Sequence, residues 1–192
     1  MILRIIFILG MVVHKLVWEM LKRRDTALRH TQQQESSAPL LTRLVKLFKM
    51  AVLGGIMVQT LFVPDVPRIR EQALPLRIVG TIIYFVGLWL AIAGRWQLGD
   101  NWVDLEDYQV MQQQDLVTRG VYQFIRHPIY AGDILLLLGL ELALNSWLVL
   151  GIIPLTAVVV RQAKAEETVL AQSFTDYHTY QQRTKMLIPF VL

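Results

Sequence analysis

Residues 129–160 read IYAGDILLLLGLELALNSWLVLGIIPLTAVVV, two apolar runs separated by one polar dipeptide. The runs are Ile129–Leu144 and Trp147–Val160, and Asn145-Ser146 between them is typical of a turn. Two apolar helices joined by so short a turn form a helical hairpin. At about 1.5 Å per residue the arms are about 21–24 Å long, shorter than the ~30 Å hydrocarbon core of a bilayer. The sequence therefore predicts a short hairpin in a membrane.

Three further apolar segments precede this hairpin, and each is long enough to cross a bilayer or nearly so. They are Met1–Leu21, Leu44–Val63 and Ile78–Gly94. The first is followed by Lys22-Arg23-Arg24 and by no small-residue cleavage site, so it is expected to be an anchor helix. With the hairpin, the segments predict an all-α fold of about five transmembrane helices.

The composition supports an integral membrane protein. Charged residues make up 18% of the chain, against about 25% in an ordinary soluble domain, and the mean hydropathy is +0.43. At 192 residues, one membrane domain over residues 1–192 is expected. Residues 1–94 would supply three N-terminal spans, and residues 95–192 a core with a loop, the hairpin and a C-terminal helical tail.

The distribution of Lys and Arg predicts the orientation in the membrane. In the five-span arrangement fourteen of them fall on one side, in the 22–49, 95–128 and C-terminal segments, and four fall on the other. By the positive-inside rule the N-terminus lies outside, and the long loop and tail lie in the cytoplasm. The net charge of +4 is explained by these flanking residues, so no nucleic-acid partner is expected. The expected location is the plasma membrane, or the inner membrane of a prokaryote.

Several kinds of site are excluded or unsupported. The chain has no cysteine, which excludes disulfides, zinc–thiolate sites, iron–sulfur clusters and thiol nucleophiles. It contains neither G-x-G-x-x-G nor the P-loop motif, so no Rossmann or P-loop nucleotide site is supported. Four scattered histidines show no pair at a ligand spacing, and no metal site is predicted.

Two clusters of polar residues flank the hairpin. The first runs from Arg126 to Gly132, where Pro128 suits the first turn of a helix and biases His127 away from helical geometry. Arg126 and His127 then stand at a helix N-terminus, where a cation gains nothing from the helix dipole. Taken alone, they could equally be an arginine anchored to lipid phosphate and a histidine at the interface.

The second cluster follows the hairpin. Glu167, Leu170, Phe174 and Tyr177 are spaced by three, four and three residues and so share one helical face. A carboxylate at the head of an apolar stripe is costly to bury unless a cation meets it. On spacing alone the simpler interpretation is that the glutamates are solvated and that Lys164 pairs with Glu167 across one turn. Asp133 and Glu141, inside the first hairpin arm, are further candidates because intramembrane carboxylates usually have a function.

Together these residues resemble the isoprenylcysteine carboxyl methyltransferase family and its phospholipid methyltransferase relatives. The resemblance extends from about Leu98 to Pro189. Its motifs are Gly99-Asp100-Asn101-Trp102, Leu116 to Tyr122, Arg126-His127-Pro128-Ile129-Tyr130 with Gly132, Asn145-Ser146, Arg161, Glu166-Glu167, Leu170, Phe174, Tyr177, Tyr180, Arg183 and Pro189. The departures are Ala165, where a third glutamate often stands, and Thr175, where glycine usually follows the phenylalanine.

The resemblance implies S-adenosylmethionine as methyl donor and S-adenosylhomocysteine as product, bound by the cytoplasmic loop, the start of the Arg-His-Pro helix and the tail. Glu167 or its neighbour Glu166 would pair with the ammonium group of the donor, and His127 and backbone N–H groups would hold its polar edges. The expected cofactor-binding residues are Leu116, Val117, Gly120, Tyr122, Arg126, His127, Pro128, Tyr130, Glu167 and Phe174.

The resemblance also implies a lipophilic methyl acceptor that arrives from the bilayer. An acceptor carboxylate of the prenylcysteine type needs no general base and suits a guanidinium clamp, for which Arg161 is the first candidate and Arg183 the second. If the acceptor is an amine or a phospholipid headgroup, Glu166 becomes the acid/base candidate. A haem- or quinone-associated subunit without catalytic activity remains an alternative of a different class. The sequence leaves the oligomeric state open.

Overall fold

The computed structural model describes residues 1–29, 54–62, 69, 73–101 and 115–188. It separates into two compact units, Met1–Pro67 and Arg68–Leu192. Within the described residues the only regular secondary structure is helical, apart from one isolated β-bridge. The expected all-α fold is therefore confirmed, whereas the single domain over residues 1–192 stays a prediction.

The first unit contains α1, Ile2–Arg29, and a helical segment over residues 54–62. The predicted span Met1–Leu21 lies in α1, which continues for two further turns. Large apolar side chains such as Ile5, Leu9 and Leu16 are exposed along α1, as expected where lipid would cover them. Of the predicted span Leu44–Val63, only residues 54–62 lie within the described part of the chain.

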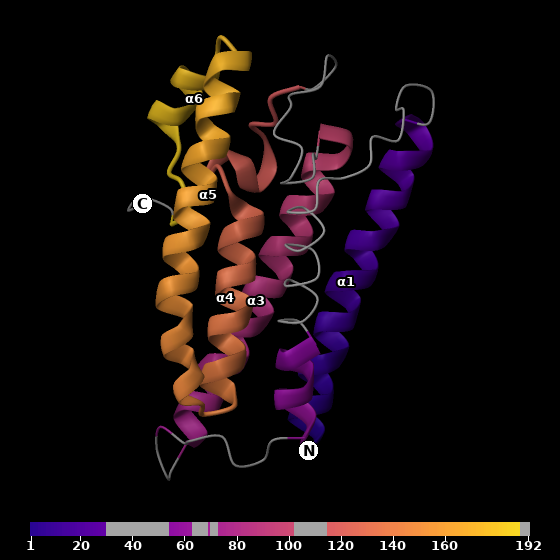
Figure 1. Cartoon of the computed structure of the whole chain (residues 1–192), viewed down its shortest axis with the longest axis vertical. Helices are drawn as coiled ribbons and strands as arrows, with labels where there is room; N and C mark the ends of the chain where they lie inside the picture. Colours follow the sequence, from indigo (N-terminus) through magenta and orange to yellow (C-terminus); the bar gives the residue numbers. More distant parts are fainter. Residues whose placement is uncertain (30–53, 63–68, 70–72, 102–114, 189–192) are drawn as a thin grey trace, which may run out of the picture. The chain divides into compact units, whose positions relative to one another are not determined.

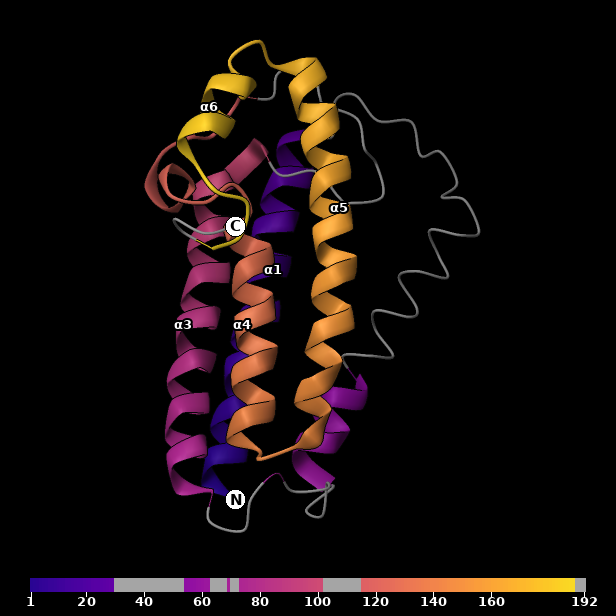
Figure 2. The same cartoon turned by 90° about the vertical axis from the view of Figure 1, so that its left-hand side faces the viewer.

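The second unit is built on two antiparallel helices, α3 (Leu74–Leu98) and α4 (Pro128–Ala143), which lie side by side in Figures 1 and 2. Their contact is lined by glycines. A Cβ atom at Gly87 would lie 2.7 Å from the carbonyl oxygen of Gly132, and one at Gly139 would lie 2.6 Å from that of Gly80. Small residues at these positions let the two backbones touch, which is how helices associate in a membrane.

The turn after α4 is the one that the sequence predicts. Asn145 adopts a positive φ of 56°, a conformation that asparagine tolerates better than most residues. The Ser146 side chain accepts a hydrogen bond from Leu148 N at 3.1 Å and so caps the short helix η3, Trp147–Gly151. Helix α5, Ile152–Ser173, follows directly.

The two arms of the hairpin differ in length. The helix α4 has 16 residues, about 24 Å, as expected. The second arm does not end near Val160, because α5 continues without a break through the polar residues as far as Ser173. The change from apolar to polar residues after Val160 therefore alters the surface of one continuous helix and does not mark its end. A short helix α6, Tyr177–Arg183, follows α5.

Two helical stretches of the described residues are long and apolar enough to cross a membrane, Leu74–Leu98 and Trp147–Ser173. The first contains the predicted span Ile78–Gly94. The apolar helix α4 is shorter than an ordinary span and packs against α3 along its length. The count of five spans stays a prediction.

Candidate active site

The start of α4 is fixed by a short segment from the end of the chain. Residues 184–187, here called the strap, run alongside residues 124–127, with a parallel bridge between Ile125 and Lys185. Arg126 N donates to Lys185 O at 2.8 Å, and His127 N donates to Met186 O at 3.0 Å. These bonds satisfy backbone groups just before the helix, which Pro128 then starts. Segments some sixty residues apart in the sequence are thereby joined at the same end of α4.

Apolar side chains pack against the strap and hold it in place. Met186 and Leu187 are buried with Ile125, Ala131 of α4 and Ala163 of α5. Since Ala163 lies one helical turn before Glu167, the same contact brings the acidic part of α5 to the first turn of α4. The hydrophobic cluster thus positions charged residues that would not approach one another without it.

Arg126 is the centre of the charged cluster. Its Nε donates to Glu167 Oε1 at 2.6 Å, and its Nη1 donates to the carbonyl oxygens of Thr184 at 2.5 Å and Gln181 at 3.3 Å. The unfavourable position of a cation at a helix N-terminus is therefore compensated by a buried carboxylate and by two carbonyl oxygens.

Glu167 is buried and fully engaged by the chain. Its Oε1 lies 3.2 Å from His127 Nε2, and its Oε2 accepts from Gln181 Nε2 at 3.1 Å. Because a carboxylate only accepts, His127 carries a hydrogen on Nε2. The interpretation of Glu167 as a solvated charge paired with Lys164 is therefore wrong, since its partners come from the residues just before α4 and from α6 instead.

Glu166 is the more accessible of the two glutamates. Its side chain is 40% exposed, whereas that of Glu167 is 9% exposed. The Tyr130 hydroxyl donates to Glu166 Oε2 at 3.0 Å, and His127 Nδ1 lies 3.8 Å from the same oxygen. The rings of His127 and Tyr130 are stacked, with centroids 5.3 Å apart and planes at 8°. One carboxylate is thus partly open beside two parallel aromatic faces.

Two buried tyrosines, Tyr122 and Tyr180, connect α6 to α3. Tyr180 donates to the carbonyl oxygen of Tyr122 at 2.7 Å, and Tyr122 donates to that of Gly94 at 3.3 Å. Burial, with a smaller effect of neighbouring carboxylates, raises the pKa of Tyr122 and of Tyr177 above the ordinary value. Burial also raises the pKa of Tyr180. These hydroxyls therefore stay protonated over the neutral range, and those of Tyr122 and Tyr180 act as hydrogen-bond donors.

The loop before α4 is tied to the end of α3. In η2, Gly120–Gln123, Val121 N donates to Gln97 Oε1 at 2.7 Å. Gly120 has a φ of 65° and lies against the side chain of Gln97, so only glycine fits there. This contact places Tyr122 beside α6.

The structure brings some of the predicted site residues together and leaves others apart. Arg126, His127, Tyr130, Glu166 and Glu167 form the charged cluster, with Pro128 starting the helix and Tyr122 joined to it through Tyr180. The residues outside the cluster are Leu116, Val117 and Phe174, which are half-buried, Gly120, which is exposed in the loop, and Arg161 and Arg183, which are exposed.

Arg161 in particular does not join the cluster. It lies six residues before Glu167 on the same helix, which places the two about 120° apart around the helix axis. The residues from Glu167 to Tyr177 do not share one helical face as predicted, because α5 ends at Ser173 and Tyr177 begins α6.

Three contributors went unpredicted. The Gln181 side chain donates to Glu167, and its carbonyl oxygen accepts from Arg126. The Thr184 carbonyl oxygen also accepts from Arg126. Arg95 is fully buried at the end of α3. Gln181 lies one helical turn after Tyr177, so an extension of the stripe beyond Tyr177 would have found it. A backbone carbonyl oxygen leaves no such signal in a sequence.

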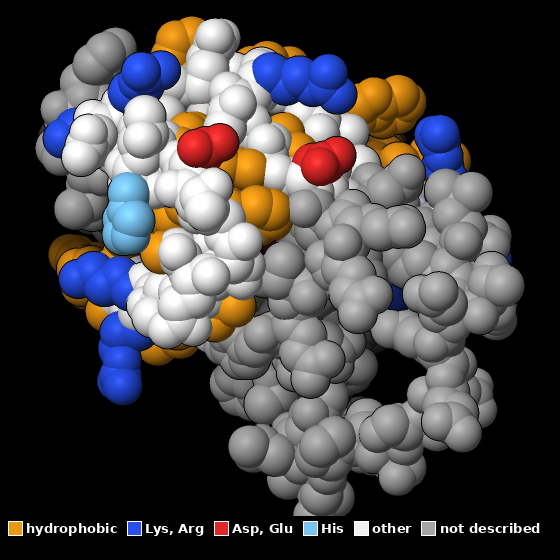
Figure 3. Space-filling model, turned by 90° about the horizontal axis from the view of Figure 1, so that it is seen from above, with side chains coloured by type: hydrophobic (Ala, Val, Ile, Leu, Met, Phe, Trp, Pro, Cys, Tyr) orange, Lys and Arg blue, Asp and Glu red, His pale blue; other side chains and the backbone are white. Residues whose placement is uncertain are grey.

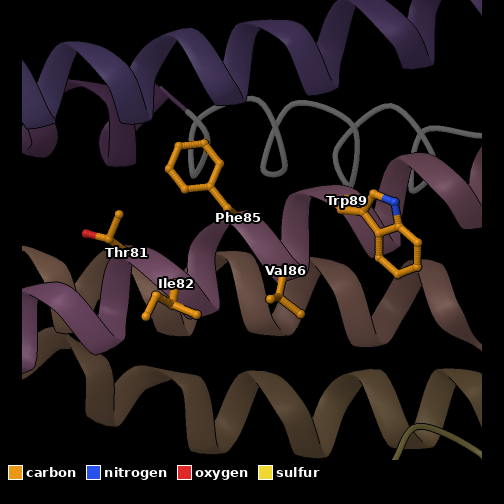
Figure 4. A pocket seen from close by; sticks show the side chains of 5 residues that line it. All are labelled: Thr81, Ile82, Phe85, Val86 and Trp89. Carbon is orange, nitrogen blue, oxygen red and sulfur yellow. The ribbon is translucent and has the colours of Figure 1, made fainter.

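Two surfaces complete the description. At the end of the molecule that carries α6, basic and acidic side chains reach the surface beside apolar ones (Figure 3). On α3, an open apolar depression of about 400 Å³ is lined by Thr81, Ile82, Phe85, Val86 and Trp89 (Figure 4). It shares no residue with the charged cluster.

Comparison with known proteins gave one family match and one structural match of interest. The model of the family described as phospholipid methyltransferase matches residues 76–177, more than half of the chain. A solved structure of the eukaryotic intramembrane Ras methyltransferase ICMT, isoprenylcysteine carboxyl methyltransferase, superimposes with a TM-score of 0.59 at 24% identity. The match covers 76% of this chain and 53% of that one. No curated protein matched.

The matched family segment contains nearly all of α3 and the whole of α4 and α5, and so includes both acidic residues and Arg126. The structural match shows that the arrangement of helices is shared with a membrane protein. The resemblance predicted from the sequence is thus confirmed. The chain belongs to the phospholipid methyltransferase family.

Proposed function

We propose that this chain transfers a methyl group from S-adenosylmethionine to a lipophilic acceptor that enters from the bilayer, releasing S-adenosylhomocysteine. The observation that carries the proposal is the cluster of Arg126, His127, Tyr130, Glu166 and Glu167, assembled within the family segment where a helix start meets the end of an apolar helix.

The chemistry of the cluster fits such a donor. Its amino-acid end carries an ammonium group, for which the partly open carboxylate of Glu166 is a suitable partner. The stacked rings of His127 and Tyr130 offer a planar apolar face for an adenine ring, and the half-buried Leu116, Val117 and Phe174 are apolar. When bound, S-adenosylmethionine supplies a methyl group made electrophilic by its positively charged sulfur.

The residues of the chain would then have separate tasks. Glu166 binds the cationic end of the donor, while Glu167 holds Arg126 and His127 in place. Tyr130 orients Glu166 through its hydrogen bond. Because the groups are positioned before the ligands arrive, and because lipid and the strap keep water away, alignment and desolvation can supply most of the catalysis.

The acceptor that we favour is a carboxylate of the prenylcysteine type. An ionised carboxylate is itself the nucleophile. Transfer therefore requires no general base, and the cluster does not need to supply one. Arg161 is the proposed clamp and Arg183 the second candidate, both exposed at the edge of the helices. A guanidinium fits a carboxylate through two parallel hydrogen bonds.

A second candidate acceptor is an amine, such as a phospholipid headgroup. The description of the matching family favours it. In that case a proton must leave the nitrogen atom, and Glu166 is the accessible carboxylate that could accept it.

The setting is also part of the proposal. The excess of Lys and Arg in the loop and tail supports a cytoplasmic active site and an external N-terminus in the plasma or inner membrane. The proposed partners are membrane lipids and the lipophilic substrate.

Binding and transfer assays on the purified protein test this function. Calorimetry in detergent should show saturable S-adenosylmethionine binding, weakened by Glu166→Gln and unchanged by Asp176→Asn at the exposed residue just before α6. A labelled-methyl assay against membrane lipid extract and a prenylcysteine analogue, read by mass spectrometry, identifies the acceptor. No donor binding together with a haem absorption band would instead favour the non-catalytic subunit.

A further inference from the structure

Helix α6 carries two buried tyrosines whose hydroxyls differ in their hydrogen bonding. Tyr180 is 9% exposed and donates to the carbonyl oxygen of Tyr122. Tyr177 is 1% exposed, and its hydroxyl has no hydrogen-bond partner among the described residues. The two rings meet edge to face, with centroids 6.0 Å apart. The contrast lies in the hydroxyl groups alone.

The Tyr177 side chain belongs to the face of α6 that meets the charged cluster. Tyr177 and Gln181 are four residues apart and therefore neighbours on the helix surface. Gln181 donates to Glu167 Oε2. Burial raises the pKa of the Tyr177 hydroxyl, and the Glu167 carboxylate raises that pKa further, so the hydroxyl stays protonated near neutral pH and can donate.

A buried hydroxyl without a partner is costly. Removing such a group from water costs on the order of 1–3 kcal/mol when no hydrogen bond replaces the lost ones. Phenylalanine would give the same shape without this cost. The hydroxyl is therefore explained best by a partner that arrives from outside the chain.

Several other donors around the cluster are already used by the chain. Arg126 donates to Glu167, Thr184 and Gln181, and Tyr130 donates to Glu166. Gln181 donates to Glu167. Both carboxylates can attract a cation, but an anionic group on the same ligand needs a donor. The Tyr177 hydroxyl can supply one.

We propose that the Tyr177 hydroxyl is part of the methyl-donor site and donates a hydrogen bond to the carboxylate of the donor's amino-acid end. This inference rests on the proposed function, because it requires that S-adenosylmethionine binds at the cluster. It makes Tyr177 a ligand-binding residue, in contrast to the structural role of Tyr180.

The test compares Tyr177→Phe with the matched variant Tyr180→Phe in the full chain. S-adenosylhomocysteine affinity is measured by calorimetry, and stability without ligand by thermal unfolding in the same detergent. Tyr177→Phe should leave the ligand-free protein as stable or more stable, and should weaken S-adenosylhomocysteine binding on the order of tenfold. Tyr180→Phe should lower the stability of the ligand-free protein, because it leaves the buried carbonyl oxygen of Tyr122 without its donor.

A decarboxylated analogue of S-adenosylhomocysteine locates the contact. Since it lacks the carboxylate, it should bind the unaltered chain and Tyr177→Phe equally. Equal loss of affinity for both ligands would overturn the assignment, as would unchanged S-adenosylhomocysteine affinity in Tyr177→Phe or a destabilised ligand-free variant. If the unaltered chain binds neither donor nor product, the proposed function itself is refuted.

Discussion

Arg126 and Glu167, 41 positions apart in the sequence, form an ion pair of 2.6 Å in which their side chains are only 11% and 9% exposed. The whole hairpin lies between them. A buried ion of either sign is unfavourable without its partner, so the pair links the start of one arm to the end of the other. The hairpin must therefore close at this end before either charge can be buried.

The ion pair makes a prediction about stability. Arg126→Gln and Glu167→Gln should each lower the free energy of unfolding by about 3–5 kcal/mol, because each leaves a buried charge without its partner. The double variant should be clearly more stable than the sum of the two losses implies. Chemical unfolding in detergent micelles measures all three. Strict additivity of the two losses would show that the residues do not interact.

The contact between α3 and α4 predicts the effect of a single methyl group. Gly87→Ala should destabilise the protein by about 1–3 kcal/mol or more, because its Cβ would lie 2.7 Å from the Gly132 carbonyl oxygen. Gly151→Ala is the control, since no atom lies within 4 Å of its added Cβ. Thermal unfolding of both variants measures the difference in their stability. A Gly87→Ala protein as stable as the control would mean that the helices separate freely.

Gln181 is predicted to act as a positioning residue. Gln181→Met keeps the length of the side chain but removes the hydrogen bond to Glu167 Oε2, so Glu167 and its partner His127 become less well ordered. We expect the KM for S-adenosylmethionine to rise several-fold while kcat changes little. Gln182→Met, at the exposed neighbouring position, should alter neither. An equal fall in kcat for both variants would point to general damage to α6.

A change at Arg161 is predicted to affect methyl transfer without affecting binding of the methyl donor. Arg161→Ala should leave S-adenosylmethionine affinity unchanged, because the residue lies outside the charged cluster, and should abolish transfer to a carboxylate acceptor. Lys164→Ala, another exposed cation on α5, is the control. Calorimetry and the labelled-methyl assay give the two quantities. If Arg161→Ala loses both, the arginine holds the donor rather than the acceptor.

The sequence predicts the local features of this protein well. The turn at Asn145-Ser146 and the start of α4 at Pro128 both follow from backbone preferences. The predicted helical face from Glu167 to Tyr177 is wrong, because α5 ends at Ser173 and Tyr177 begins α6. The family likewise follows from short motifs, because those motifs sit at the helix ends that build the site. These features depend on residues close together in the chain.

The features that the sequence did not predict depend on tertiary contacts. The length of α5 past Val160 follows from Ala163 packing under the strap, which makes an amphipathic stretch part of the same helix. The buried state of Glu167 requires Arg126 to arrive from the other side of the hairpin. Spacing within α5 alone favours Lys164 as a partner, because Lys164 is the nearest cation in sequence.

The bridge between Ile125 and Lys185 has a consequence for the order in which the protein is made. Synthesis proceeds from the N-terminus, so both hairpin arms are complete before the strap leaves the ribosome. Until then Arg126 lacks the carbonyl oxygens of Gln181 and Thr184. A nascent chain that stops short of Lys185 therefore has both arms of the hairpin but lacks the backbone contacts that complete the charged cluster.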